Sequence, residues 1–128
     1  MPWDGNRLYL ARLDNNGHIQ SHEHIAGGDN ISVFQPQWSP DDILYYISDD
    51  TGWWHLYRYI ETASQSQIEQ LTWGNKEFGL PQWVFAQSTY TFINNTRILC
   101  CYQSEGETTL ASLSAGKQPE LTEITTPW

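Results

Sequence analysis

The stretch VFQPQWSPDDILYYISDDTGWWHLYRY (residues 33–59) decides the fold. Aromatic and β-branched residues dominate three runs within it, at 34–38, 43–47 and 53–59. Such residues favour the pleated, half-buried surface of a β-strand. Two turn signals, SPDD at 39–42 and DDTG at 49–52, separate the runs. The stretch therefore predicts consecutive antiparallel strands joined by short turns.

Further strands are predicted on both sides of this stretch. On the same grounds they fall at residues 7–13, 18–25, 67–71, 89–93, 97–102, 110–113 and 120–124. The sequence DNNG at 14–17 predicts a hairpin turn between the first two, because Asn and Gly tolerate positive φ angles. Since ILYYI at 43–47 aligns with ILCCY at 98–102, a four-stranded unit recurs after about 55 residues.

A four-stranded unit with this period is typical of a β-propeller blade. We therefore expect an all-β chain, a partial β-propeller of about two and a half antiparallel four-stranded blades. Its units are the end of one blade (1–28), a complete blade (29–73) and a second blade (74–128). A blade buries both faces against its neighbours, so the outermost faces would be uncovered. Hence we expect either a piece of a longer protein or a homo-oligomer formed through the exposed blade faces.

Charge and composition exclude several function classes. Six Lys and Arg against fifteen Asp and Glu leave a formal net charge of −9, which disfavours nucleic acid as a partner. No apolar run approaches the roughly 20 residues needed to cross a bilayer, and no secretory signal opens the chain. The two cysteines, Cys100 and Cys101, are adjacent and predicted to lie on one strand, where they point to opposite faces. We expect two buried, reduced thiols and a cytoplasmic protein without a membrane partner.

Three ordered segments resemble one known family. PQWSPDDILYYISDDTGWWHLYRY (36–59) is similar to the propeller repeat of the prolyl oligopeptidase family of serine peptidases, in its acylaminoacyl-peptidase and dipeptidyl-aminopeptidase branch. MPWDGNRLYLARLD (1–14) before it and EFGLPQWVFAQSTYTF (77–92) after it look like the same branch. The resemblance covers nearly the whole chain. One departure is Asp42, where the repeat usually has Gly, which puts the usual turn geometry at that position in question.

The resemblance implies a role beside an enzyme. In the family, an N-terminal propeller caps a C-terminal α/β-hydrolase domain that holds a Ser, Asp and His triad, and the propeller limits access to peptides of modest size. This chain contains no Gly-x-Ser-x-Gly segment, so we expect no catalytic residue in it. We expect a non-catalytic propeller fragment that gates peptides, with the hydrolase domain and peptides as partners and no cofactor. The alternative is a stand-alone propeller that binds a protein partner, and a third reading is a truncated relic without activity.

Candidate binding residues cluster around the second turn and the link between the two blades. Trp53, Trp54, Phe78 and Trp83 suit packing between blades, where large aromatic side chains fill the gap. The functional interpretation is that Trp53 or Trp54 contacts substrate. Glu77 could likewise accept a peptide amino terminus.

Two other motifs resemble metal sites, but turn and surface roles are the better interpretation of both. His22 and His24 share one strand face without a third ligand, and the turns at 14–17 and 49–52 lack the downstream Glu of a calcium loop. We therefore predict no metal site.

Overall fold

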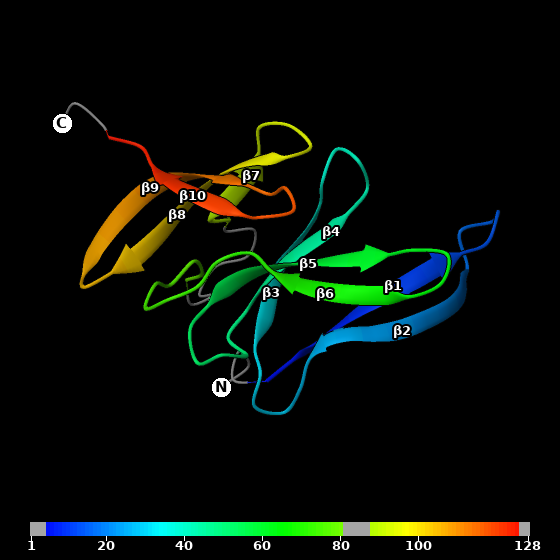
Figure 1. The fold of residues 1–128 in the computed structure, drawn as a ribbon. Helices are drawn as coiled ribbons and strands as arrows, with labels where there is room; N and C mark the ends of the chain where they lie inside the picture. Colours follow the sequence, from blue (N-terminus) through cyan, green and yellow to red (C-terminus); the bar gives the residue numbers. More distant parts are fainter. Residues whose placement is uncertain (1–4, 81–87, 126–128) are drawn as a thin grey trace.

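The computed structural model describes residues 5–80 and 88–125. Within these residues the chain forms ten β-strands and no helix (Figure 1). The all-β prediction is therefore confirmed. The strands are β1 (Arg7–Leu13), β2 (Ile19–Gly27), β3 (Val33–Trp38), β4 (Leu44–Ser48), β5 (His55–Glu61), β6 (Ser66–Gln70), β7 (Tyr90–Phe92), β8 (Arg97–Ser104), β9 (Glu107–Ser114) and β10 (Glu120–Glu123).

The strands form three separate antiparallel sheets. β1 and β2 make a two-stranded sheet, and the other two sheets have the orders β3-β4-β5-β6 and β10-β9-β8-β7. Each sheet thus follows the chain order, as expected when short turns join neighbouring strands. Two four-stranded sheets and one two-stranded sheet, none of them closed, match the predicted partial propeller of two and a half blades.

Strand β4 is buried along its whole length. Because successive side chains of a strand point to opposite faces, Tyr45 and Ile47 enter one apolar cluster, whereas Leu44 and Tyr46 enter another. A strand buried on both faces reads as a near-continuous apolar run, which explains the sequence LYYI. The central sheet therefore has a core on each side.

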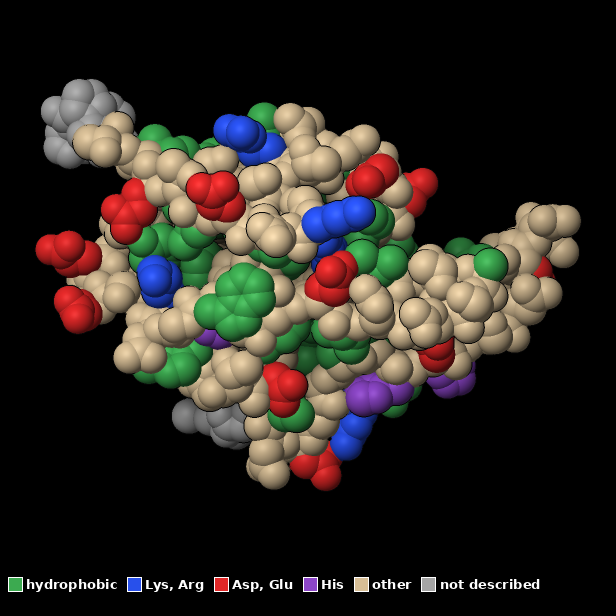
Figure 2. All heavy atoms as spheres, viewed as in Figure 1, with side chains coloured by type: hydrophobic (Ala, Val, Ile, Leu, Met, Phe, Trp, Pro, Cys, Tyr) green, Lys and Arg blue, Asp and Glu red, His purple; other side chains and the backbone are tan. Residues whose placement is uncertain are grey.

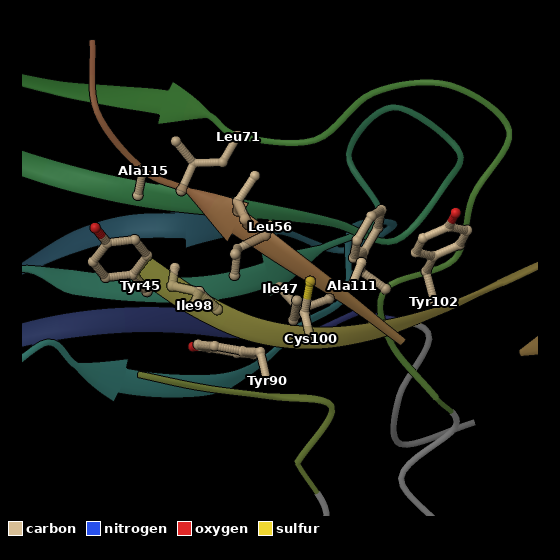
Figure 3. Close-up of a cluster of buried hydrophobic side chains, with 12 residues drawn as sticks. Tyr45, Ile47, Leu56, Leu71, Tyr90, Ile98, Cys100, Tyr102, Ala111 and Ala115 are labelled. Carbon is tan, nitrogen blue, oxygen red and sulfur yellow. The ribbon is translucent and has the colours of Figure 1, made fainter. Parts of the chain in front are cut away.

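The larger core joins the central sheet to the β7–β10 sheet (Figure 3). Ile47 and Leu56 from the central sheet pack in one cluster with Ile98, Cys100 and Leu113, all of them buried. Fully burying one Leu or Ile side chain contributes about 1.5–3 kcal/mol. The smaller core joins the central sheet to β1 and β2, and its buried residues are Ile25, Val33, Leu44, Tyr46, Tyr57 and Tyr59.

A buried arginine ties the two larger sheets together. Arg58 on β5 pairs with Glu69 on β6 at 3.0 Å and is only 7% exposed. Its guanidinium also donates to the carbonyl oxygens of Ala115 and Gly116, at 3.0 Å in the second case, just beyond β9. Planar guanidinium donors suit such multiple contacts, and every partner here is an acceptor. One charged side chain thereby spans the two sheets.

A bulge in β3 makes a second connection between these sheets, near their edge strands β3 and β7. Gln35 has a φ of 55° at the register shift between β3 and β4. A bulge re-aims a side chain, and here the Gln35 amide oxygen accepts a hydrogen bond from the Thr89 backbone N–H at 2.7 Å. The Tyr90 hydroxyl donates to the Gln35 carbonyl oxygen at 2.6 Å.

The two cysteines are free thiols with different surroundings. Cys100 is buried in the larger core, and burial raises its pKa to about 12. Cys101 is only partly buried, so the expectation of two buried thiols is wrong for this residue. Its side chain points to the opposite face of β8, away from the larger core, where it lies near the connection between β6 and β7.

The outer faces of the two outer sheets, β1–β2 and β7–β10, carry exposed apolar side chains, as predicted. Tyr9 on β1 is 51% exposed and Leu110 on β9 is 37% exposed. Acidic side chains are scattered over the visible face rather than gathered in one patch (Figure 2). None of the described residues belongs to a helix that is long and apolar enough to cross a membrane.

In the SPDD turn, Asp42 adopts the left-handed backbone conformation at the position where the similar family repeat usually has Gly. Asp42 has a φ of 63°, and its N–H donates to the Ser39 carbonyl oxygen at 2.9 Å. The Ser39 hydroxyl accepts the Ile43 N–H at 2.9 Å. The geometry that glycine adopts freely is therefore retained with an aspartate.

Replacing Asp42 by Gly should raise the free energy of unfolding by about 0.5–1 kcal/mol. A non-glycine residue in the left-handed region costs about 1–2 kcal/mol, and the greater freedom of glycine in the unfolded chain offsets part of the gain. Chemical denaturation measures the change. Asp41→Gly is the matched control: Asp41 is not among the residues with positive φ and accepts the Ser39 hydroxyl, so this change should lower stability. Equal effects of both substitutions would contradict a conformational cause.

Candidate substrate-contact site

The structure brings two of the three predicted site residues together. Trp53 and Trp54 end the β4–β5 loop, directly before β5, and Glu77 lies in the connection between β6 and β7. A Glu77 carboxylate oxygen accepts the Trp54 backbone N–H at 2.7 Å. Trp53 takes no part in this contact and is 37% exposed. Of the two indole rings, that of Trp53 is therefore the more available to a ligand.

The ring of Trp54 packs against the protein. It meets Phe34 edge to face, with ring centroids 4.8 Å apart and planes at 78°. This is a preferred geometry for two aromatic rings. The packing interpretation thus holds for Trp54, and Trp83 lies outside the described residues.

Phe78 is the anchor of the connection that carries Glu77. Its backbone N–H donates to the Trp54 carbonyl oxygen at 2.7 Å, and its side chain is 2% exposed. The ring lies between His55 and Tyr102, with centroids 5.9 Å and 5.1 Å away. Phe78 therefore packs between the sheets, as predicted.

Glu77 also binds the neighbouring sheet through its main chain. Its N–H donates to the Gln103 carbonyl oxygen at 2.8 Å, and the Gln103 N–H donates back at 2.9 Å. Because its side chain bonds to Trp54 at the start of β5, Glu77 contacts both large sheets at once. The candidate site is thus located at a junction between two blades.

Beside Glu77 is a small cavity of about 100 Å³. Its lining residues are Glu77, Gly79, Leu80, Thr89, Cys101, Tyr102, Gln103 and Thr108. No histidine or lysine is among them to favour a thiolate at Cys101, and burial raises the pKa of its thiol. The arrangement can accept hydrogen bonds and a positive charge, but it offers no activated nucleophile.

His55 is a site residue that the sequence pattern did not identify. Its Nδ1 lies 2.8 Å from the Thr72 hydroxyl, and its Nε2 lies 3.0 Å from the Gly74 carbonyl oxygen. Burial lowers the pKa of His55; the hydrogen bond to the Gly74 carbonyl opposes this shift, and the charge of Lys76 adds to it. A histidine on a predicted strand beside two tryptophans is the only signal that the sequence carried.

The motifs that resemble metal sites serve local packing and turn formation instead. His22 and His24 flank the ring of Tyr9, with centroids 5.7 Å and 5.6 Å away. The turn at 49–52 is closed by a hydrogen bond from the Gly52 N–H to the Asp49 carbonyl oxygen at 2.8 Å. Across residues 5–80 and 88–125, no group of three or more His, Cys, Asp or Glu side chains could hold a metal ion.

Replacing Gly79 by Ala should lower the free energy of unfolding by about 1–3 kcal/mol, the usual cost of overpacking. A Cβ atom at this position would come within 2.5 Å of the Phe34 ring and 2.8 Å of the Trp54 ring. Chemical denaturation followed by tryptophan fluorescence measures the effect. Gly116→Ala is the control, because a Cβ there meets nothing within 4 Å, and its effect should stay within about 0.5 kcal/mol. Comparable losses in both variants would show that Gly79 is not held by close packing.

Several solved structures match this chain over its whole length. One is a Mycobacterium tuberculosis puromycin-hydrolyzing peptidase, with 26% sequence identity and a TM-score of 0.83. Another is a puromycin hydrolase, with 30% identity and a TM-score of 0.83. In both comparisons all of this chain is covered but only 19% of the other chain. No protein-family model matches the sequence, and no curated protein is significantly similar to it.

Proposed function

We propose that this chain, a β-propeller segment of the prolyl oligopeptidase family of serine peptidases, limits the access of peptides to a hydrolase domain and has no catalysis of its own. The observation that carries the proposal is the match along the entire chain to two peptidases, of whose length it spans 19%. The chain contains no Gly-x-Ser-x-Gly segment. Within the family we place it in the acylaminoacyl-peptidase and dipeptidyl-aminopeptidase branch, on the resemblance of its repeat.

In this proposal Trp53, Trp54 and Glu77 contact the substrate. Trp53 supplies an exposed aromatic face for an apolar side chain of the peptide. One Glu77 oxygen is bound by the Trp54 N–H, and the carboxylate retains capacity to accept a peptide ammonium group. The ring of Trp54 packs on Phe34 and its N–H binds Glu77, so Trp54 contributes to the contact by holding the Glu77 carboxylate in place.

The division into units 1–28, 29–73 and 74–128 is part of the proposal. It is supported by the three sheets, whose strands span residues 7–27, 33–70 and 90–123. We also propose a cytoplasmic setting, which the two free thiols support.

The test is a chimera in which these 128 residues replace the matching segment of the puromycin hydrolase. Glu77→Gln in the chimera should raise KM for substrates with a free amino terminus about 10-fold or more and leave kcat within about twofold. Hydrogen bonds to a charged group contribute about 1.5–3 kcal/mol, which corresponds to that change.

Glu105→Gln is the matched control, because this exposed residue lies on the β8–β9 turn. An unchanged KM in Glu77→Gln would remove the amine-binding role. Gating has its own readout, since the chimera should cleave short peptides and reject large unfolded proteins. A reading frame that stops at Trp128 would instead favour the stand-alone interaction module.

We further predict that the isolated chain self-associates through its open faces. Leu110 lies on the face of β9 that no described sheet covers, and exposed apolar surface of this kind drives association. Light scattering over a range of concentrations should show oligomers that Leu110→Asp shifts toward monomer. Ile68→Asp on β6 should leave the distribution unchanged, because Ile68, 47% exposed, pairs with Tyr59 of the smaller core and so lies on the side of the central sheet that faces β1 and β2. A monomeric wild-type chain at every concentration would contradict this prediction.

A further inference from the structure

The connection between β6 and β7 is held at its first residues by the ring of His55. The Gly74 carbonyl oxygen can only accept a hydrogen bond, so His55 Nε2 must carry the proton. The Leu56 N–H donates to the Thr72 hydroxyl at 3.1 Å, which leaves that hydroxyl free to donate to His55 Nδ1. The His55 ring, the Thr72 hydroxyl, the Gly74 carbonyl oxygen and the Leu56 N–H all have hydrogen-bond partners in this arrangement. This requires a neutral imidazole with its proton on Nε2.

The same connection returns to the neighbouring residue, Trp54, a few positions later. There the Glu77 carboxylate accepts the Trp54 N–H, and the Phe78 N–H donates to the Trp54 carbonyl oxygen. The segment 72–78 is therefore bonded at both of its ends to two adjacent residues at the start of β5. Only Asn75 and Lys76 separate Gly74 from Glu77, so we expect a displacement of one end to reach the other.

We propose that His55 is a positioning residue, whose neutral ring holds segment 72–78 in place and thereby keeps Glu77 in contact with Trp54. The functional meaning of this role rests on the proposed function, in which Trp53, Trp54 and Glu77 contact the peptide. The bonding itself does not depend on a substrate.

Protonation of His55 opposes this arrangement. Nδ1 would become a donor facing the Thr72 hydroxyl, whose own proton would lose its acceptor. Lys76 on the connection is the charged group that acts on the ring. Glu77 follows it along the chain, Tyr102 on β8 packs against Phe78, whose ring His55 also meets, and Asp49 follows Ser48, the strand partner of His55. The Glu77 carboxylate accepts the Trp54 N–H and the Asp49 carboxylate accepts the Ser32 N–H at 2.6 Å, and none of the ion pairs among the described residues involves His55.

The direction of the pH dependence follows from this. The pKa of His55 is lowered by burial, so the unfolded or released state takes up a proton at a higher pH than the closed state. The arrangement in which segment 72–78 is bonded to His55 and Trp54 is then fully favoured above the ordinary histidine pKa of about 6.5. It becomes less stable as the pH falls below that value.

Hydrogen exchange followed by NMR on the whole chain tests the proposal. Protection factors, corrected for intrinsic exchange, are measured at pH 7.5 and 5.0 for the backbone N–H groups of Trp54 and Phe78. We expect both to fall by about tenfold or more at the lower pH, as in a local opening. The Ala115 N–H, which donates to the Thr96 carbonyl oxygen at 2.7 Å, should change little and serves as the internal reference.

Two variants separate the ring from other titrating groups. His55→Gln keeps a donor and an acceptor but does not titrate, so it should abolish the pH dependence while retaining protection at pH 7.5. His22→Gln removes an exposed histidine and should leave the wild-type behaviour unchanged. A pH dependence that persists in His55→Gln, or none in the wild type, would overturn the proposal.

If His55→Gln does not fold, the titration of the wild-type ring decides. A His55 ring that titrates at or above about 6.5 would show that it is not held neutral, whereas a lower value supports the proposal. This readout involves no substrate, so it is independent of the chimera experiment. Failure of the peptidase assay alone would remove the functional meaning and leave the positioning role intact.

Discussion

The burial of β4 on both faces is the constraint on which the rest of the structure depends. A strand whose side chains alternate between two cores can exist only if a second sheet lies against each side of its own sheet. Here Tyr45 and Ile47 require the β7–β10 sheet, and Leu44 and Tyr46 require β1 and β2. One strand of five residues thus determines that three sheets stack in a row.

Apolar packing alone does not set how the sheets are oriented, and polar side chains supply that information. Arg58 bonds to the carbonyl oxygens beyond β9, and Gln35 bonds to Thr89 at the start of β7. Glu77 also links the two sheets, because it bonds to Trp54 directly before β5 and to Gln103 on β8. Hydrogen bonds are directional, so these contacts select one arrangement among the many that would bury a similar apolar area. The candidate site lies within this framework, which explains why Glu77 has both a structural contact and a proposed binding role.

Much of the fold could be predicted because its signals are local. The turns at 39–42 and 49–52 and the alternation of the strands are readable from neighbouring residues, and the repeat places the second blade. Less of the site could be predicted. The contact between Trp54 and Glu77 joins positions 23 residues apart, and the role of His55 depends on Thr72 and Gly74, which no sequence pattern connects to it. The different exposure of Cys101 likewise depends on which sheet covers which face.

The sequence by itself determined that residues 33–59 form consecutive strands of one blade, because strand propensity and turn chemistry act over a few neighbouring residues. The sequence also predicted a turn at residues 39–42, but only the structure showed that Asp42 adopts the left-handed conformation of a glycine there. The tertiary structure alone decided which side chains meet between blades. Those contacts join distant parts of the chain, and their geometry exists only once the two cores on either side of β4 have formed.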